Sequence, residues 1–197
     1  MDTTRAAVAL LVLLPTACSR GPAPSSSSAA ADPARPLPSP VPEVVARVNG
    51  QPIRIQQILP MAKAELDRVS VADRDRKKPE VLRHALQRYV DRELLVQEAL
   101  ARGVEADSRD VDWAYDQMRR EHPDEKAWEE FLAGQGMDPK TFRTELRTQQ
   151  TVAALLEQEH AREAARSEGA DRPRTGEELE AALLARLRAK ARIELLF

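Results

Sequence analysis

The chain contains few of the side chains from which catalytic and metal sites are built. It has one cysteine and three histidines, and the histidines lie on separate predicted helices or loops, at His84, His122 and His160. A single cysteine cannot form an internal disulfide, and no HExxH, CxxC, nucleophile elbow or glycine-rich phosphate loop occurs. The sequence therefore predicts no catalytic residue, no cofactor and no metal, and each histidine is interpreted as a surface or helix-end residue.

The chain also lacks an excess of charge of one sign. It carries 30 basic and 32 acidic residues, for a net charge of −2. There is no long block of like charge, and the charges alternate along helical faces. We therefore expect no nucleic-acid partner and interpret the charges as a solvated surface.

No hydrophobic run in the sequence is long enough to cross a bilayer as a helix, which needs about 20 apolar residues. The longest run, Ala6 to Leu14, follows Arg5 and is followed by Pro15 and the small residues Thr16 and Ala17. This pattern is typical of the apolar core of a signal peptide. The sequence predicts a signal peptide over residues 1–17.

Cys18 directly follows this segment. Its position resembles the lipobox cysteine of bacterial lipoproteins, which is acylated after cleavage before it, although Pro15 stands where Leu is usual and Asp2 is unusual in such a leader. The resemblance implies lipid attachment at Cys18 and a membrane anchor. Ser19 is not acidic, which favours the outer over the inner membrane by analogy. Plain secretion, or a cytoplasmic protein with an apolar N-terminus, remain the alternatives.

Residues 18–42 are rich in Ser, Pro and Ala, as in the run from Ser25 to Ser28 and the stretch from Pro36 to Pro40. Such a composition buries too little apolar surface to offset the entropy of ordering. We expect a lipidated, disordered tether that holds the folded part, residues 43–197, away from a membrane.

The two ends of the folded part have the pattern of strands. Val44 to Ile55 alternates apolar and polar residues around Asn49-Gly50, a strong hairpin signal, although Pro52 also permits a loop that enters the first helix. Ile193 to Phe197 is short and apolar, and we expect it to pair with Val44 to Val48. These edge strands leave open a swapped homodimer.

Between the strands, helical periodicity predominates, so the predicted fold class is mostly α with a small β element formed by the hairpin and the C-terminal strand. The expected helices run from Gln56 to about Val69, from a first turn containing Pro79 to Gly103, from Asp107 through Met118, around Trp128 to Leu132, from Asp138 to about Ala165, and from Glu177 to about Ala191.

The aromatic residues are few, at 4% of the chain. Trp128 and Phe131 lie on the apolar face of a predicted helix and are interpreted as core. Trp113 lies two residues from Val111, which turns it about 200° away from the apolar stripe of its helix. It is a candidate contact for other polypeptides, because exposed aromatic side chains suit an adaptable apolar surface. The alternative is that it packs against a second helix.

The order of the segments resembles the chaperone domain of the periplasmic SurA, PpiD and PrsA foldases. The resemblance rests on Val45 to Ile53, on Tyr89 to Ala99 followed by Arg102-Gly103-Val104, on Asp107 to Met118, and on Phe131 to Leu146. In that family a parvulin prolyl isomerase domain is commonly inserted or appended. The slot here, Ser167 to Gly176, is far shorter than the roughly 50 residues that a domain needs, so we expect no isomerase and no enzyme.

The resemblance implies an ATP-independent chaperone (holdase) of the cell envelope. It would bind unfolded exported proteins, including outer-membrane proteins, in the periplasm while anchored to a membrane. The alternative hypothesis is a structural or assembly lipoprotein that uses the same module to bind one specific envelope partner.

Overall fold

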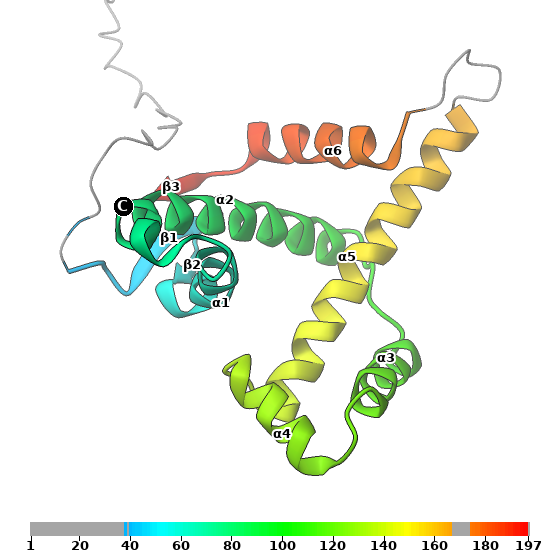
Figure 1. The fold of residues 1–197 in the computed structure, drawn as a ribbon. Helices are drawn as coiled ribbons and strands as arrows, with labels where there is room; N and C mark the ends of the chain where they lie inside the picture. The colour runs from blue at the N-terminus through cyan, green and yellow to red at the C-terminus, as the bar shows by residue number, and fades with distance from the viewer. Residues whose placement is uncertain (1–37, 39, 167–173, 197) are drawn as a thin grey trace, which may run out of the picture.

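The computed structural model describes residues 38, 40–166 and 174–196 (Figure 1). The predicted signal peptide and Cys18 lie outside the described residues. So do most of the predicted tether, residues 167–173 of the predicted loop, and Phe197. The described part is mostly helical with one small sheet, which confirms the predicted fold class.

The sheet joins the two ends of the described chain. β1 (Val44–Val48) lies between β2 (Gln51–Arg54) and β3 (Ile193–Leu195), and both pairings are antiparallel. Asn49 and Gly50 have φ angles of 51° and 87°, as the tight turn of the hairpin requires. The predicted hairpin and the predicted pairing of the C-terminal strand are both confirmed, and β3 pairs with β1 of the same chain.

The helices follow the sequence pattern closely. They are α1 (Ile55–Leu66), the short 3-10 helix η1 (Val71–Asp73), α2 (Arg74–Ala101), α3 (Ser108–Arg120), α4 (Glu125–Gly134), α5 (Pro139–Arg166) and α6 (Gly176–Lys190). Asp107 caps α3 by accepting a hydrogen bond from the Arg109 N–H, and Gly103 follows the end of α2 with a φ angle of 65°. Both were expected from the sequence.

The start of the long helix α2 was predicted wrongly. The sequence placed Pro79 in its first turn, but α2 begins at Arg74, so that Pro79 lies inside the helix. Pro79 has no N–H to bond the carbonyl of Asp75, so this helical hydrogen bond is missing. Val81 and Leu82, shortly after Pro79, are buried in the body and hold this part of the helix in place. The charged residues 74–78, which lie between the first two expected helices, are helical.

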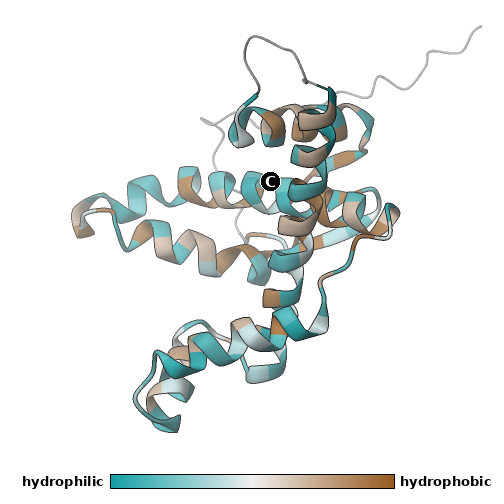
Figure 2. Cartoon of the chain, turned by 90° about the vertical axis from the view of Figure 1, so that its right-hand side faces the viewer, coloured by the Kyte–Doolittle hydropathy of each residue, from teal (hydrophilic) through white to brown (hydrophobic). Residues whose placement is uncertain are grey.

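The apolar side chains form two separate clusters instead of one core. The larger, which we call the body, contains the sheet, α1, α2, α6 and the later part of α5. The smaller, which we call the arm, contains α3, α4 and the start of α5; its buried members are Val111, Tyr115, Trp128, Leu132, Phe142 and Leu146. Figures 1 and 2 show the arm projecting from the body in two views at right angles.

One helix belongs to both clusters. Phe142 and Leu146 of α5 are buried in the arm, while Leu155 of the same helix is buried in the body. α5 therefore carries the arm and sets its place relative to the body. Among the described residues, no helix has both the length and the apolar character needed to cross a membrane.

Candidate functional site

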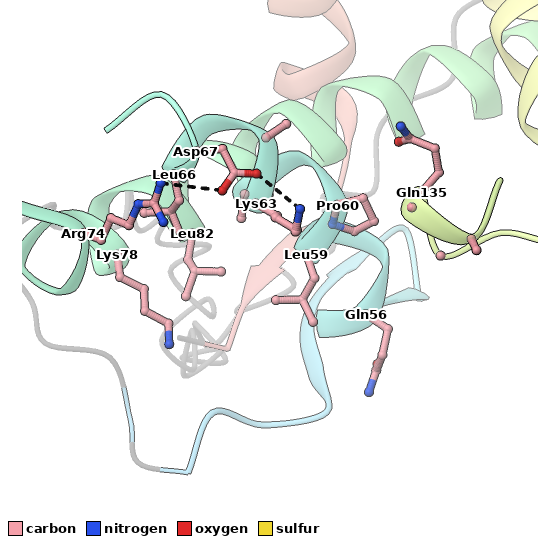
Figure 3. A pocket seen from close by; sticks show the side chains of 15 residues that line it. Gln56, Leu59, Pro60, Lys63, Leu66, Asp67, Arg74, Lys78, Leu82 and Gln135 are labelled. Atoms are coloured by element: carbon pink, nitrogen blue, oxygen red, sulfur yellow. Dashed lines mark hydrogen bonds and ion pairs between the residues drawn. The ribbon is translucent and has the colours of Figure 1, made fainter. Parts of the chain in front are cut away.

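An open groove separates the body from the far end of α4. Its volume is about 780 Å³, within the range of about 300–1,000 Å³ that is typical of ligand pockets. Its lining comes from Gln56, Leu59, Pro60, Ala62, Lys63, Ala64, Leu66 and Asp67 of α1 and its end, from Arg74, Lys78 and Leu82 of α2, and from Ala133 to Gly136 at the end of α4. Figure 3 shows the labelled members of this set around the hollow.

On α1, the groove is lined by a stripe of side chains that differs from the stripe buried in the body. Its lining residues include Gln56, Leu59, Lys63 and Leu66, which recur at helical spacing. Ile58, on the other side, is fully buried in the body. Leu59, next to it in the chain, is left 45% exposed. Ala62 of the lining is also buried in the body and Leu66 packs partly against it, so Leu59 is the exposed large apolar side chain of this wall.

Pro60 shapes the same wall. It lies inside α1, where it has no N–H to donate to the carbonyl of Gln56, four residues earlier. Both residues line the groove. The helical hydrogen bond between residues 60 and 56 is therefore missing from this part of α1.

The α4 wall consists of Gln135 and of the small residues Ala133, Gly134 and Gly136. The N–H of Gly136 donates to the Ala133 carbonyl at 2.9 Å and the N–H of Met137 to the Leu132 carbonyl at 3.0 Å, which closes the helix end. A Cβ added at Gly134 or Gly136 would meet nothing within 4 Å, so this wall leaves open space. The groove can accept side chains of different sizes on that side.

The aromatic cluster of the arm supports the α4 wall. Trp128 meets Tyr115 edge to face at 5.4 Å between ring centroids, and its indole N–H donates to the Tyr115 hydroxyl at 3.3 Å. Phe131 stacks on Trp128, and Phe142 meets both rings at their edges. The interpretation of Trp128 and Phe131 as core is confirmed, since they pack inside the arm.

Polar contacts fix the junction between α2 and α5, and with it the position of the arm. Arg92 of α2 pairs with Glu145 of α5 at 2.6 Å. Arg102 at the end of α2 pairs with both Glu98 and Glu159. The Ala106 N–H in the α2–α3 connection donates to the Thr151 hydroxyl at 3.2 Å, and Thr151 is buried.

The Glu159 carboxylate is the electrostatic centre of this junction. Partial burial raises its pKa, but hydrogen bonding and charge from Arg102 lower it more, and Arg162 and Arg186 add to the effect. The net result is a Glu159 pKa below its ordinary value, so the carboxylate stays charged and paired at neutral pH.

Positively charged side chains outnumber negatively charged ones in the groove lining. Asp67 accepts from Lys63 at 3.2 Å and lies 3.9 Å from an Arg74 nitrogen (Figure 3). Lys78 also lines the groove and forms no ion pair with any residue in the described part of the chain. The groove thus combines an apolar floor with three cations and one carboxylate.

The sequence-predicted site residues do not meet in this groove. Trp113 is 66% exposed on α3, which excludes the alternative that it packs against a second helix, and it is not part of the groove lining.

Cys18 lies outside the described residues. His84 is 2.9 Å from Glu65, and His122 packs against Phe131. No group of His, Cys, Asp and Glu within the described ranges is arranged to hold a metal ion.

The groove was missed from the sequence. Its lining comes from segments about 70 residues apart in the chain, between α1 and the end of α4, which no local pattern connects. One signal was present: α1 carries apolar residues on two faces, with Leu59 beside Ile58. The second stripe indicates a surface beyond the one needed for the core.

The fold and the groove define a helical module with an open, largely apolar contact surface. The chain belongs to the family of the SurA-like N-terminal domain, which matches residues 22–156. This family indicates a periplasmic, chaperone-type module that binds client proteins, and the matched domain is the non-catalytic one. A search of curated proteins found no match. α6 and β3 follow the matched residues, yet β3 completes the sheet.

Proposed function

We propose that this protein is an ATP-independent holdase of the cell envelope that binds unfolded exported proteins, including outer-membrane proteins, in the groove between α1 and α4. The observation that carries the proposal is the open groove with the exposed Leu59 on its α1 wall. Membership of the family supports the chaperone class, and the open, largely apolar lining of the groove supports it as the client site.

Binding would consist of the reversible burial of client side chains. Burying one large apolar side chain contributes about 1.5–3 kcal/mol, and part of that is spent on ordering the bound segment. A groove of about 780 Å³ holds only a few side chains at once. Each contact is therefore weak enough to release without ATP, and a long client is held by repeated contacts.

The proposal includes the membrane anchor. A signal peptide over residues 1–17, lipid attachment at Cys18 and a tether over residues 18–42 would hold the chaperone domain, residues 43–197, at the periplasmic face of the outer membrane. This arrangement is supported by the sequence pattern and by the periplasmic character of the family. It would keep the groove close to clients that arrive at that membrane.

Trp113 is proposed as a second client contact. It is 66% exposed on the arm, among the polar side chains of Asp110, Asp112 and Asp116. A lone exposed tryptophan adds apolar area without a preformed pocket. It would assist the groove in holding long clients and would matter less than the groove itself.

The test follows light scattering by an unfolded outer-membrane β-barrel protein on dilution from urea. The full chain is reconstituted into phospholipid nanodiscs, with empty nanodiscs as the blank. We expect suppression of aggregation that scales with protein concentration, strong loss with Leu59→Asp, partial loss with Trp113→Ala, and no loss with Val71→Asp. Val71 is the matched control, since it is 79% exposed and does not line the groove.

Two outcomes would contradict the proposal. Absence of suppression for several unrelated clients would favour an assembly lipoprotein with one specific partner. Equal loss from Leu59→Asp and Val71→Asp would remove the groove from the mechanism.

A further inference from the structure

The cations of the groove lie beside its apolar floor. Leu59 and Leu66 belong to the same helical stripe as Lys63, and Leu82 lies one turn of α2 from Lys78. Figure 3 shows the side chains of Lys63, Arg74 and Lys78 around the same hollow as Leu59 and Leu82. Any segment that buries an apolar side chain on this floor brings its neighbours close to positive charge.

The single carboxylate in the groove lining does not neutralise its three cations. Asp67 pairs with Lys63 and Arg74, while Lys78 has no ion pair with the described residues. The chain as a whole is slightly acidic, with a net charge of −2, so a groove with an excess of cations differs from the average surface. An excess of one sign at a binding site selects partners of the other sign.

We propose, on the basis of the function proposed above, that the groove prefers extended client segments in which an acidic side chain lies next to an apolar one. The apolar side chain would occupy the floor at Leu59, and the carboxylate would meet Lys78 and Lys63. Client choice thus rests on charge as well as on apolar content.

An anionic lipid headgroup would also attract these cations. The cations, however, line a groove with helical walls on both sides and an apolar floor, whereas an amphipathic helix that lies on a membrane turns its apolar face outward into the lipid. The geometry therefore favours a polypeptide segment, and a lipid becomes one outcome of the test.

The test compares labelled unstructured peptides that share one apolar segment and are flanked by Asp, Asn or Lys. Fluorescence anisotropy measures their binding to the full chain in nanodiscs of zwitterionic lipid. We expect the Asp-flanked peptide to bind about fivefold more tightly than the Asn-flanked one, and the Lys-flanked peptide to bind most weakly. High salt should reduce these differences, because exposed charges are screened.

A double variant assigns the preference to the groove. In Lys63→Gln/Lys78→Gln, the Asp- and Asn-flanked peptides should bind almost equally, while binding of the Asn-flanked peptide is unchanged. Lys126→Gln/Lys140→Gln removes the same charge from the arm, outside the groove lining, and should keep the preference.

The outcomes separate the two proposals. Binding of the Asn-flanked peptide without any preference for Asp would overturn the charge selection and leave the holdase intact. Failure of every peptide to bind would count against the holdase itself. Displacement of the Asp-flanked peptide by anionic vesicles, but not by unfolded protein, would assign the cations to lipid and overturn the inference.

Discussion

Asn49 joins three parts of the body through one side chain. Its backbone adopts a φ of 51° in the hairpin turn, its amide nitrogen donates to Gln97 of α2 at 2.8 Å, and its amide oxygen accepts from the Arg192 N–H at 2.8 Å. The sequence Asn49-Gly50 predicted the turn, but the contacts to α2 and to the residue before β3 required the structure.

Replacing Asn49 by alanine removes both side-chain hydrogen bonds and leaves a residue with Cβ in the left-handed region. We expect Asn49→Ala to lower the free energy of unfolding by about 2–3 kcal/mol, measured by urea denaturation. Asn49→Gly loses the same hydrogen bonds but tolerates the φ angle, so it should cost less. Equal effects of the two variants would show that backbone conformation contributes nothing at this turn.

Glu159 makes the junction sensitive to acid. Its pKa is lower in the folded chain than in the unfolded one, because the hydrogen bonds and charge of Arg102 and its neighbours outweigh the effect of burial. Stability from this group is therefore fully present above the ordinary glutamate pKa, and it is lost as the pH falls through the lowered folded value. The loss belongs to the acid range, below the pKa of a glutamate in the unfolded chain.

Glu159→Gln should consequently unfold more easily than the natural chain at neutral pH, and the difference should shrink as the pH falls through the acid range. Urea midpoints measured across that range check this expectation. Glu129→Gln, at an exposed position on α4, is the control and should show little difference at any pH. A gap for Glu159→Gln that stays constant down to strong acid would contradict the assigned pKa direction.

At the scale of elements, the arm depends on one aromatic cluster. Trp128 is 1% exposed and contacts Tyr115, Phe131 and Phe142. Truncating a buried tryptophan costs about 3–5 kcal/mol, and the body has a separate cluster of its own. We expect Trp128→Ala to raise amide hydrogen exchange throughout α3 and α4 while the amides of α2 keep their protection.

Trp113→Ala is the matched control for this experiment. The side chain is 66% exposed, so its removal should change stability by less than about 0.5 kcal/mol. If Trp128→Ala exposed the amides of α2 to the same extent as those of α4, the arm and the body would be one cooperative unit.

Local signals predicted most of the elements. The hairpin followed from Asn49-Gly50, the start of α3 from Asp107, and the end of α2 from Gly103, because each depends on the conformational preference of one or two residues. Pro79 misled the prediction for the opposite reason. Proline is favoured in the first helical turn. It is tolerated further inside when buried side chains near it hold the helix in place, as Val81 and Leu82 do here.

The groove could not be predicted in the same way. Its walls lie on helices whose helical faces are visible in the sequence, but their mutual position depends on how α5 divides its apolar residues between two clusters. Phe142 and Leu155 are 13 residues apart, which places them about 220° apart around an α-helix, but only their partners in space show that one face packs in the arm and the other in the body. Trp113 was correctly predicted to turn away from the stripe, and its role as a client contact stays a prediction.

At the scale of the molecule, the arm and the body are joined by α5 and by the short connection from α2 to α3. The groove lies between them, so a small change in the tilt of α5 would change its width. Arg92–Glu145 and the Arg102 pairs hold this tilt. β3 and α6 close the body by joining the C-terminal part of the chain to β1 and α2.

The most direct test of client binding in the groove locates the bound client by photo-crosslinking. Benzoylphenylalanine is placed at Leu59 or Gln135 on the two groove walls, and at Val71 or Glu129 outside them. The full chain in nanodiscs is then mixed with an unfolded outer-membrane protein and irradiated. We expect crosslinks from Leu59 and Gln135 that a second unlabelled client competes away, with few from Val71 and Glu129. Equal crosslinking from all four positions would contradict a client site in the groove.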